Sequence, residues 1–305
     1  MSLKQLLVLS GKGGTGKTTV SSSFIKLSNA RAFADCDVDA PNMHLVLGDL
    51  GEPKRSPYQG LSLSSIVQEK CTHCGLCYEN CRFGAIERIP VDNPNAENEY
   101  TYHVSEFGCE GCSVCQLVCP AKAVIMTPSI TGDLELYKHD DVAFSTAQLR
   151  MGSGASGKLV SAVKSDLKDA TDAMDVPKDT IAIIDGSPGI GCPVIASLAG
   201  VNMVLIVTEP SVSGISDMER IIKIAEKFSI TTAICINKYD TNKQKADSIA
   251  DYCAEKKIHL AGKIPFDEQA GKAINMGKTV VDIDCAAAEA IRKVYKNTIN
   301  ILGSC

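Results

Sequence analysis

Short apolar runs alternate with longer segments of helical periodicity along much of the chain. Runs short enough to be buried strands are QLLVL at residues 5–9, IAIID at 181–185, MVLIVT at 203–208, TAICIN at 232–237 and HLAGKI at 259–264. The segments between the later runs have the length and the polar-apolar spacing of helices. This alternation predicts an α/β fold with a mostly parallel, doubly wound sheet.

Residues 58–128 interrupt the alternation. They contain two cysteine-rich runs separated by a spacer at 82–108 that is rich in Asn, Glu and Pro and reads as a loop or hairpin. The run LELYKHDDVAFSTAQL, at 134–149, then has the pattern of a strand pair. We therefore predict one α/β domain in two parts, residues 1–57 and 129–305, with a second domain inserted at 58–128.

The first apolar run leads directly into GKGGTGKTT, which is followed by a helical pattern. A strand, a glycine-rich loop and a helix in this order are the context in which G-x4-G-K-S/T forms a phosphate-binding P-loop. Backbone N–H groups would cradle the phosphates, Lys17 would reach the β and γ phosphates, and the Thr18 hydroxyl would ligate Mg²⁺. The predicted nucleotide-binding residues are Gly11, Lys12, Gly13, Gly14, Thr15, Gly16, Lys17, Thr18 and Thr19.

The cysteines point to a second chemistry. Of 14 in the chain, eight form two runs of the spacing C-x2-C-x2-C-x3-C, which is the pattern of a bacterial ferredoxin with two [4Fe-4S] clusters. The fourth cysteine of each run ligates the other run's cluster. The first predicted cluster is bound by Cys71, Cys74, Cys77 and Cys119, and the second by Cys109, Cys112, Cys115 and Cys81. A pair of tetrahedral zinc sites is the alternative. The run departs from the ferredoxin pattern at Arg82, where proline is usual.

The net charge and its distribution along the chain limit the classes of partner that the protein can bind. The net charge is -5 with a pI near 5.6, so the chain lacks the basic footprint of a nucleic-acid binder. Residues 58–128 hold eight Asp and Glu against four Lys and Arg, which would steer a basic partner toward the inserted domain. The N-terminus reads as a buried strand rather than a signal peptide, and patterned thiols suit a reducing compartment. We expect a cytoplasmic protein without stable membrane association.

The motifs together resemble one family. GKGGTGKTT has a second lysine, Lys12, and is similar to the deviant Walker A motif of the MinD/ParA/Mrp class of P-loop ATPases. DCDVDAPNMHL at 35–45 resembles the switch I segment of that class, and IAIIDGSPGIGCP at 181–193 resembles its Walker B strand and switch II. The nearest form of the resemblance is the subset with an inserted two-cluster ferredoxin domain of the α+β type, which is associated with metallocluster assembly.

The resemblance implies roles for individual residues. Lys12 would reach across a dimer interface to the partner's phosphates and, with Lys17, stabilise transition-state charge. Asp37 would position the attacking water near Mg²⁺, and Asp185 would orient the ion. The roles of Asp35 and Asp39 are left open, either catalytic or confined to the loop.

The nucleotide base has two interpretations. The resemblance makes Asn237 an adenine-facing residue, assisted by Pro265 and Asp267. NKYD at 237–240 also has the spelling of the guanine-reading motif of GTPases, so GTP is the alternative to ATP.

A further cysteine, Cys192, lies at the end of switch II, near the place where the nitrogenase iron protein has a cluster ligand. We hypothesise that two copies of Cys192 face each other in a dimer and hold a transient cluster or metal.

Three functions fit these features. The first is an ATPase, slow and stimulated by its partner, that acts in metallocluster assembly or maturation through ATP-dependent closure of a homodimer or of a heterodimer with a close paralogue. The second is an ATP-gated electron donor, and both would need a redox or cluster-accepting partner protein. The third and weakest is a positional ATPase like MinD, because the C-terminal helix pattern lacks the basic, strongly apolar character of a membrane anchor.

Overall fold

The computed structural model describes residues 3–92, 98–154, 156–174, 176–177 and 180–304. The chain divides into two compact units. The first comprises residues 1–55, 134–148 and 160–305, and the second, here called the cysteine unit, comprises residues 56–133 and 149–159. Part of the predicted spacer loop, at 93–97, lies outside the described residues.

The cysteine unit therefore includes a segment, 149–159, that the sequence pattern assigned to the α/β domain. Contacts within the unit explain the difference. Arg150 forms a two-pronged hydrogen bond with Asp133, at 3.1 and 3.0 Å. A Cβ atom at Gly152 would lie 2.4 Å from the ring of Phe107, so this glycine allows the segment to pack closely on the ring.

The first unit is built on a sheet whose strand order is β13-β12-β11-β1-β10-β2-β9-β8-β3. Every registered pair from β13 to β9 is parallel, which confirms the predicted mostly parallel α/β sheet. The strands are β1 (Lys4–Ser10), β2 (Ala32–Asp35), β3 (Lys54–Gln59), β8 (Ile130–His139), β9 (Val142–Leu149), β10 (Ile181–Pro188), β11 (Met203–Thr208), β12 (Thr231–Asn237) and β13 (His259–Ile264). All five apolar runs are strands, and the predicted pair at 134–149 is β8 and β9.

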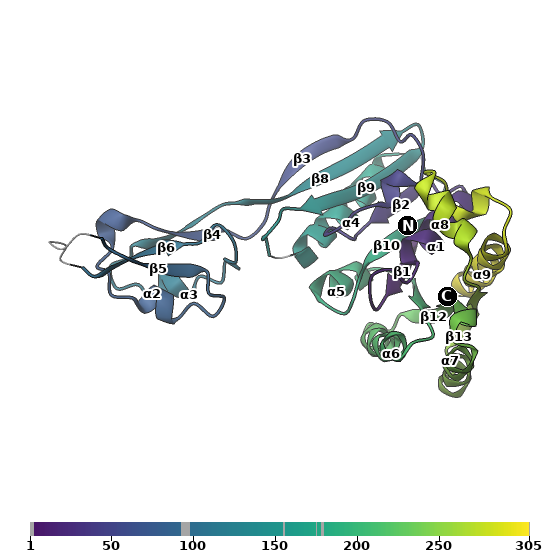
Figure 1. Cartoon of the computed structure of the whole chain (residues 1–305). Coiled ribbons are helices and arrows are strands. Elements are labelled where there is room, and N and C mark those ends of the chain that lie inside the picture. The colour runs from purple at the N-terminus through teal and green to yellow at the C-terminus, as the bar shows by residue number, and fades with distance from the viewer. Residues whose placement is uncertain (1–2, 93–97, 155, 175, 178–179, 305) are drawn as a thin grey trace. The chain divides into compact units, whose positions relative to one another are not determined.

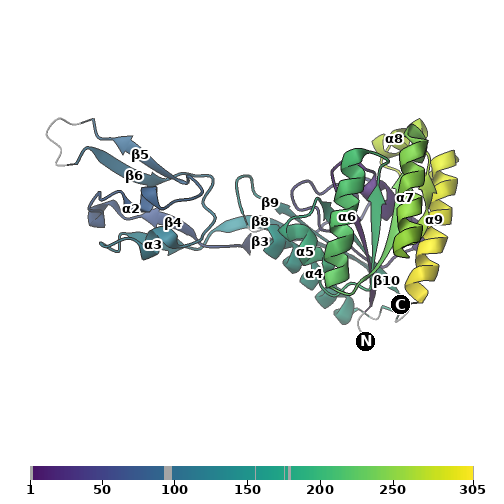
Figure 2. The same cartoon turned by 90° about the horizontal axis from the view of Figure 1, so that it is seen from below.

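Helices cover both faces of the parallel part of this sheet (Figure 1, Figure 2). One face packs against α1 and α9, and the other against α5, α6 and α7. The helices that lie wholly or mostly in this unit are α1 (Lys17–Ser28), α4 (Ser156–Ala173), α5 (Cys192–Leu198), α6 (Val212–Lys227), α7 (Lys243–Lys256), α8 (Glu268–Asn275) and α9 (Ala286–Gly303). Because both faces are covered, the central strands are apolar throughout rather than alternating.

Strand β1 shows why the chain folds this way. Its residues from Leu6 to Leu9 are all fully buried. Side chains alternate between the faces of a strand, so Leu6 and Val8 join the core under α1 and α9, whereas Leu7 and Leu9 face the opposite layer. The carboxyl ends of the parallel strands then meet at one edge, which is where ligands bind in such sheets.

The cysteine unit has a different construction. Two short antiparallel pairs, β4 (Leu63–Ile66) with β7 (Val124–Thr127) and β5 (Ile86–Pro90) with β6 (Tyr100–Val104), accompany the one-turn helices α2 (Leu76–Glu79) and α3 (Val114–Leu117). The helices α2 and α3 lie against each other. Among the described residues its core comprises Cys77, Ile86, Tyr102, Cys115 and Val124.

Candidate functional site

The predicted P-loop connects β1 to α1 with the geometry of an anion site. Gly14 and Gly16 have φ angles of 79° and 89°, in the left-handed region that glycine enters without strain. A Cβ atom at Gly16 would lie 2.3 Å from Asn237 Nδ2, so the loop also needs glycine there for space. The loop leads directly into α1 at Lys17, where free N–H groups and the helix dipole favour phosphate.

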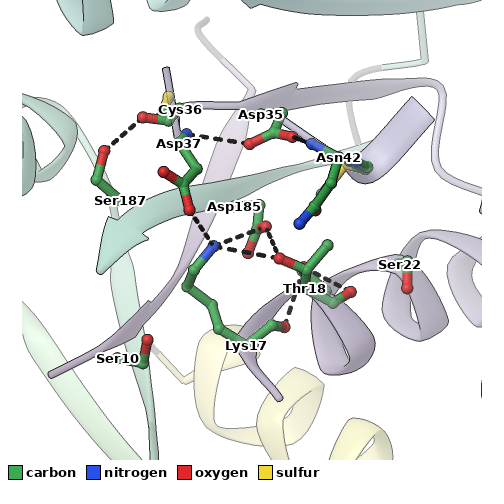
Figure 3. Close-up of polar contacts among 12 residues, drawn as sticks. Ser10, Lys17, Thr18, Ser22, Asp35, Cys36, Asp37, Asn42, Asp185 and Ser187 are labelled. Carbon is green, nitrogen blue, oxygen red and sulfur yellow. Dashed lines mark hydrogen bonds and ion pairs between the residues drawn. The ribbon is translucent and has the colours of Figure 1, made fainter. Parts of the chain in front are cut away.

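Lys17 lies at the centre of the site and points toward the ends of β2 and β10 (Figure 3). Its Nζ is 2.8 Å from Asp185 Oδ2 and 4.0 Å from Asp37 Oδ2. Burial lowers the pKa of Lys17, but attraction to Asp185, Asp35 and Asp37 outweighs it, so the pKa is raised above its usual value. The lysine is therefore charged at neutral pH and is held by carboxylates that a phosphate could replace.

Thr18 and Asp185 form the predicted magnesium pair. The Thr18 hydroxyl donates a hydrogen bond of 2.7 Å to Asp185 Oδ2. The other oxygen, Asp185 Oδ1, is buried and has no hydrogen-bond partner in the described structure. A buried, unpartnered carboxylate oxygen beside a P-loop hydroxyl fits a hydrated Mg²⁺, because the ion prefers oxygen ligands and retains several waters.

Asp35, whose role the sequence left open, organises the switch I loop. It is fully buried, and its two oxygens accept hydrogen bonds of 3.0 Å from the backbone N–H groups of Asp37, Asn42 and Met43. Burial, together with repulsion from Asp185, raises the pKa of Asp35 to about 7. The geometry makes Asp35 a positioning residue rather than a group that faces the ligand.

Asp37 and Asp39 both line the cavity that opens above Lys17. Burial raises the pKa of Asp37, and the charge of Lys17 opposes this rise. Asp39 is exposed. The structure thus brings Asp37 to Lys17 and Asp185 as predicted, whereas Asp39 lies further toward solvent.

The cavity has a volume of about 750 Å³, within the usual range for small-ligand sites. P-loop residues Gly13, Gly14, Gly16, Lys17, Thr18 and Thr19 form its floor, with Asp37 and Ser187 from the two switch segments. Leu45 and Val46 on one side and Ile274 and Asn275 on the other complete the wall. Leu45 ends the predicted switch I segment, but sequence reasoning gave none of these four residues a role in lining the site.

None of the three predicted base-contacting residues lines this cavity, and Asn237 is the one that contacts the P-loop. Asn237 Nδ2 donates to the Thr15 carbonyl at 2.7 Å. Asp267 caps α8 by accepting the Gln269 N–H at 2.9 Å. Asp240, which a guanine-reading motif would aim at the base, accepts the Phe266 N–H at 2.8 Å. The contact of Asp240 is structural, and the adenine-facing role of Asn237, Pro265 and Asp267 stays a prediction.

The cysteine unit contains two cavities lined by the two predicted ligand sets. One is lined by Cys71, Cys74, Cys77 and Cys119, together with Tyr102 and Val124. The other is lined by Cys81, Cys109, Cys112 and Cys115, together with Phe83 and Ile86. Cys119 thus lines the cavity of the first run and Cys81 that of the second, whereas their ligation of clusters stays a prediction.

The thiols line these cavities without converging on a point. Among the described residues no group of three or more His, Cys, Asp or Glu side chains is arranged to hold a single metal ion, and none of the described cysteines forms a disulfide. A single ion needs its ligands gathered around one centre, whereas a [4Fe-4S] cube takes each thiolate on a different iron. The arrangement of the described thiols therefore does not show a bound metal of either kind, and both the two clusters and the zinc alternative stay predictions.

The fourth cysteine of each run accepts an equivalent backbone hydrogen bond at its sulfur. The Ala85 N–H donates to Cys81 Sγ at 3.3 Å, and the Ala123 N–H donates to Cys119 Sγ at 3.2 Å. Ser64 adds bonds to Cys109 Sγ alone, at 3.3 Å from its hydroxyl and 3.5 Å from its N–H. Such bonds stabilise thiolate and tune the potential of a bound cluster.

Left-handed backbone occurs at matching places in the two runs. His73, Gly75 and Gly84 in the first run correspond to Gly111, Ser113 and Lys122 in the second, and all six have φ between 50° and 79°. Three of these residues have side chains, so the conformation is strained there. The repeated conformation shows that the two cysteine runs share one loop geometry.

Cys192 is exposed and is the first residue of α5, at the end of the switch II segment. Its neighbour Pro193 lines the nucleotide cavity. Cys192 is thus on the surface beside the nucleotide site, and its role in holding a metal between subunits stays a prediction.

A glycine loop at the start of a helix, a buried lysine between two carboxylates and a hydroxyl-carboxylate pair define a P-loop nucleotide-binding protein. The sequence model of the CobQ/CobB/MinD/ParA nucleotide-binding domain matches residues 6–280. The chain therefore belongs to that family, which confirms the nucleotide-binding part of the resemblance.

Two relatives align with nearly the full length of this chain. An uncharacterised protein of Methanocaldococcus jannaschii is 28% identical over 306 residues, which cover 96% of this chain and 96% of that protein. The septum site-determining protein MinD of Neisseria meningitidis is 23% identical over 311 residues, covering 97% and 89% of the two chains.

Solved structures share the fold. MinD of Pyrococcus horikoshii, determined in complex with Mg-ADP, superposes with a TM-score of 0.55 at 17% identity, covering 99% of this chain and 98% of its own. Within the described residues of the present chain, no helix is long and apolar enough to cross a membrane.

Proposed function

We propose that this protein is an ATP-dependent switch of the MinD type whose cysteine unit binds two [4Fe-4S] clusters. ATP is favoured over GTP because Asp240 is engaged by the Phe266 N–H rather than directed toward a base. A relative from M. jannaschii is named an ATP-binding protein and is 22% identical over 97% of this chain. Hydrolysis would use Lys17, Asp37 and Mg²⁺ held by Thr18 and Asp185.

The observation that carries the cluster assignment is the pair of cavities in the cysteine unit. Each is lined by three cysteines of one run and the fourth cysteine of the other, which is how a two-cluster ferredoxin shares its ligands. When bound, the clusters would supply one-electron redox chemistry. The chain would supply thiolates, the N–H donors to sulfur and a largely apolar enclosure.

The function that suits both units is metallocluster maturation, in which closure of an ATP-bound dimer controls delivery of a cluster or of electrons. The switch I loop that Asp35 holds precedes β3, and β3 leads into the cysteine unit. A movement of switch I on hydrolysis would therefore be transmitted along a short stretch of chain. ATP-gated electron transfer is the alternative use of the same parts.

A MinD-like positional function is the second candidate. It is favoured by one relative and one solved structure that are MinD proteins, although the sequence alone made it the weakest of the three functions. It assigns the cysteine unit a structural or docking role, and in that case nucleotide binding would not alter a bound cluster.

The test is anaerobic purification followed by iron and sulfide analysis. Two [4Fe-4S] clusters require about eight irons per chain, and a carrier should bind labile iron beyond them. Cys119→Ser should lower iron to about four per chain, whereas Cys285→Ser, a change in the first unit, should leave it unchanged. Zinc in place of iron in wild-type protein, or a full iron complement in Cys119→Ser, would refute the assignment.

Cys192 can be tested in the same preparation. A metal shared between two Cys192 side chains predicts that Cys192→Ala abolishes iron beyond the eight permanent atoms and slows metal transfer to an acceptor. Unchanged iron content and transfer would remove Cys192 from the site.

A further inference from the structure

Glu209 lies beside the P-loop and faces two lysines. Lys238 Nζ donates to Glu209 Oε1 at 2.6 Å, and Lys12 Nζ lies 3.6 Å from Glu209 Oε2. The carboxylate side chain is 18% exposed, whereas that of Lys12 is 41% exposed. The signature lysine of the P-loop is therefore paired with a carboxylate of its own chain.

Lys238 ties this cluster to the phosphate loop. Its Nζ also donates to the Gly14 carbonyl at 3.1 Å. The residue follows β12 with a left-handed φ of 53°, which places its ammonium group between the ends of β11 and β12 and the loop. Lys238, the lysine of the NKYD segment, therefore links Glu209 to the P-loop, and this role does not involve base recognition.

The two pairs with Glu209 differ in strength. The bond from Lys238 is short and charge-assisted, and the side chain of that lysine is only 33% exposed. The contact of Lys12 is longer, and Lys12 is the more exposed lysine, so solvent and salt weaken it more. Lys12 can leave Glu209 without uncovering an unpaired buried charge, because Lys238 stays.

Lys12 cannot contact Glu209 and reach phosphates outside its own site at the same time. Closing a dimer around ATP, with Lys12 directed at the partner's nucleotide, requires the lysine to exchange this carboxylate for phosphate oxygens. Breaking the contact with Glu209 costs free energy, and this cost depends on the charge of Glu209. The free energy of binding ATP in the closed dimer must offset it.

We propose that Glu209 is a latch that holds Lys12 on its own subunit and thereby sets the ATP concentration at which the dimer closes. The latch rests on the ATP-dependent dimer of the proposed function. Glu209 is a positioning residue in this mechanism: it acts on the nucleotide through Lys12, and Lys238 keeps it in place.

The experiment compares Glu209→Gln with Glu226→Gln in the full-length protein. Glu226 is exposed on α6, so its substitution makes the same change in net charge away from the P-loop. Sedimentation velocity over a range of Mg·ATP concentrations gives the ATP concentration at half dimerisation. Glu209→Gln should lower it by about three- to fivefold relative to Glu226→Gln, the upper part of the range expected for a partly exposed ion pair.

Affinity for Mg·ADP separates a latch from a general charge effect. Because ADP lacks the γ phosphate, removing a latch should leave the Mg·ADP dissociation constant within about twofold of that of Glu226→Gln. A fall in that constant by the same factor as the dimerisation threshold would overturn the proposal, since Glu209 would then merely repel nucleotide.

The remaining outcomes are also decisive. If wild-type protein dimerises with ATP and Glu209→Gln has the threshold of Glu226→Gln or a higher one, the latch is wrong and the proposed dimer stands. If wild-type protein remains monomeric at saturating Mg·ATP, the proposed dimer is wrong, and the latch is overturned with it.

Discussion

The two units of this protein differ in the size of the hydrophobic core that stabilises each of them. The first unit has strands that are buried on both faces and a core that extends from β1 to α9. The described core of the cysteine unit has five buried side chains, and two of them are predicted cluster ligands. A core this small supplies little of the free energy that folding requires, so small domains commonly depend on metals or disulfides. We therefore expect the first unit to fold before it binds nucleotide, and the cysteine unit to depend on the proposed clusters for its folding.

Removing the proposed clusters should give the largest difference between the two units. Chelation of iron from the intact protein should lower hydrogen-exchange protection in residues 56–133 by about a hundredfold or more, because ligand binding there is also folding free energy. Residues 160–305 should keep their protection. Equal protection of the cysteine unit before and after iron removal would show that its own core is sufficient.

Asp37 should affect ATP hydrolysis without affecting the stability of the first unit. Asp37→Asn should lower the rate of ATP hydrolysis by about 100- to 1000-fold, the usual loss for a group aligned on the reacting atoms. Asp39→Asn, an exposed neighbour on the same loop, should change it less than about threefold. Steady-state hydrolysis and nucleotide affinity measured side by side would check this, and similar losses in both variants would contradict the assigned roles.

Asp35 should give the first unit a pH-dependent stability. Its folded-state pKa of about 7 lies above the unfolded value of 3.8, so between these values the folded state binds more protons. The unfolding free energy should fall as pH rises from about 4 to about 7, by on the order of 1 to 4 kcal/mol. Asp35→Asn should flatten this slope in urea titrations, whereas Asp49→Asn, whose side chain is exposed, should retain it.

The smallest expected effect concerns the hydrogen bonds from Ser64, which reach a cysteine of one cavity and not of the other. Ser64→Ala should lower the potential of one cluster by on the order of 40 mV, because Cys109 loses a hydrogen bond worth about 1 kcal/mol. The other cluster should not move. Ser65→Ala, on the same strand, is the matched control, and equal shifts of both clusters would show that Ser64 does not act through Cys109.

Local patterns predicted much of this protein. The glycines and Lys17 are adjacent in the chain, so their arrangement follows from one loop, and the apolar runs specify the central strands. The cysteine spacing also anticipated which four thiols line each cavity, because the crossed pairing is built into the repeat.

Contacts between distant segments could not be predicted. Lys12 and Glu209 meet only because β1 and β11 are neighbours in the sheet. Asp35 was ambiguous because its partners are backbone N–H groups, which carry no sequence signature. The inclusion of 149–159 in the cysteine unit depends on Phe107 and Asp133, which no motif relates to that segment.

The most direct test of the proposed coupling is an anaerobic redox titration followed by electron paramagnetic resonance, with and without Mg·ATP. If the nucleotide switch acts on the cysteine unit, Mg·ATP should shift the potential or the spectrum of at least one cluster, and Asp37→Asn should retain the shift because it binds ATP without hydrolysing it. Identical titrations in the two conditions would contradict the account and would leave the cysteine unit as an independent docking or structural module.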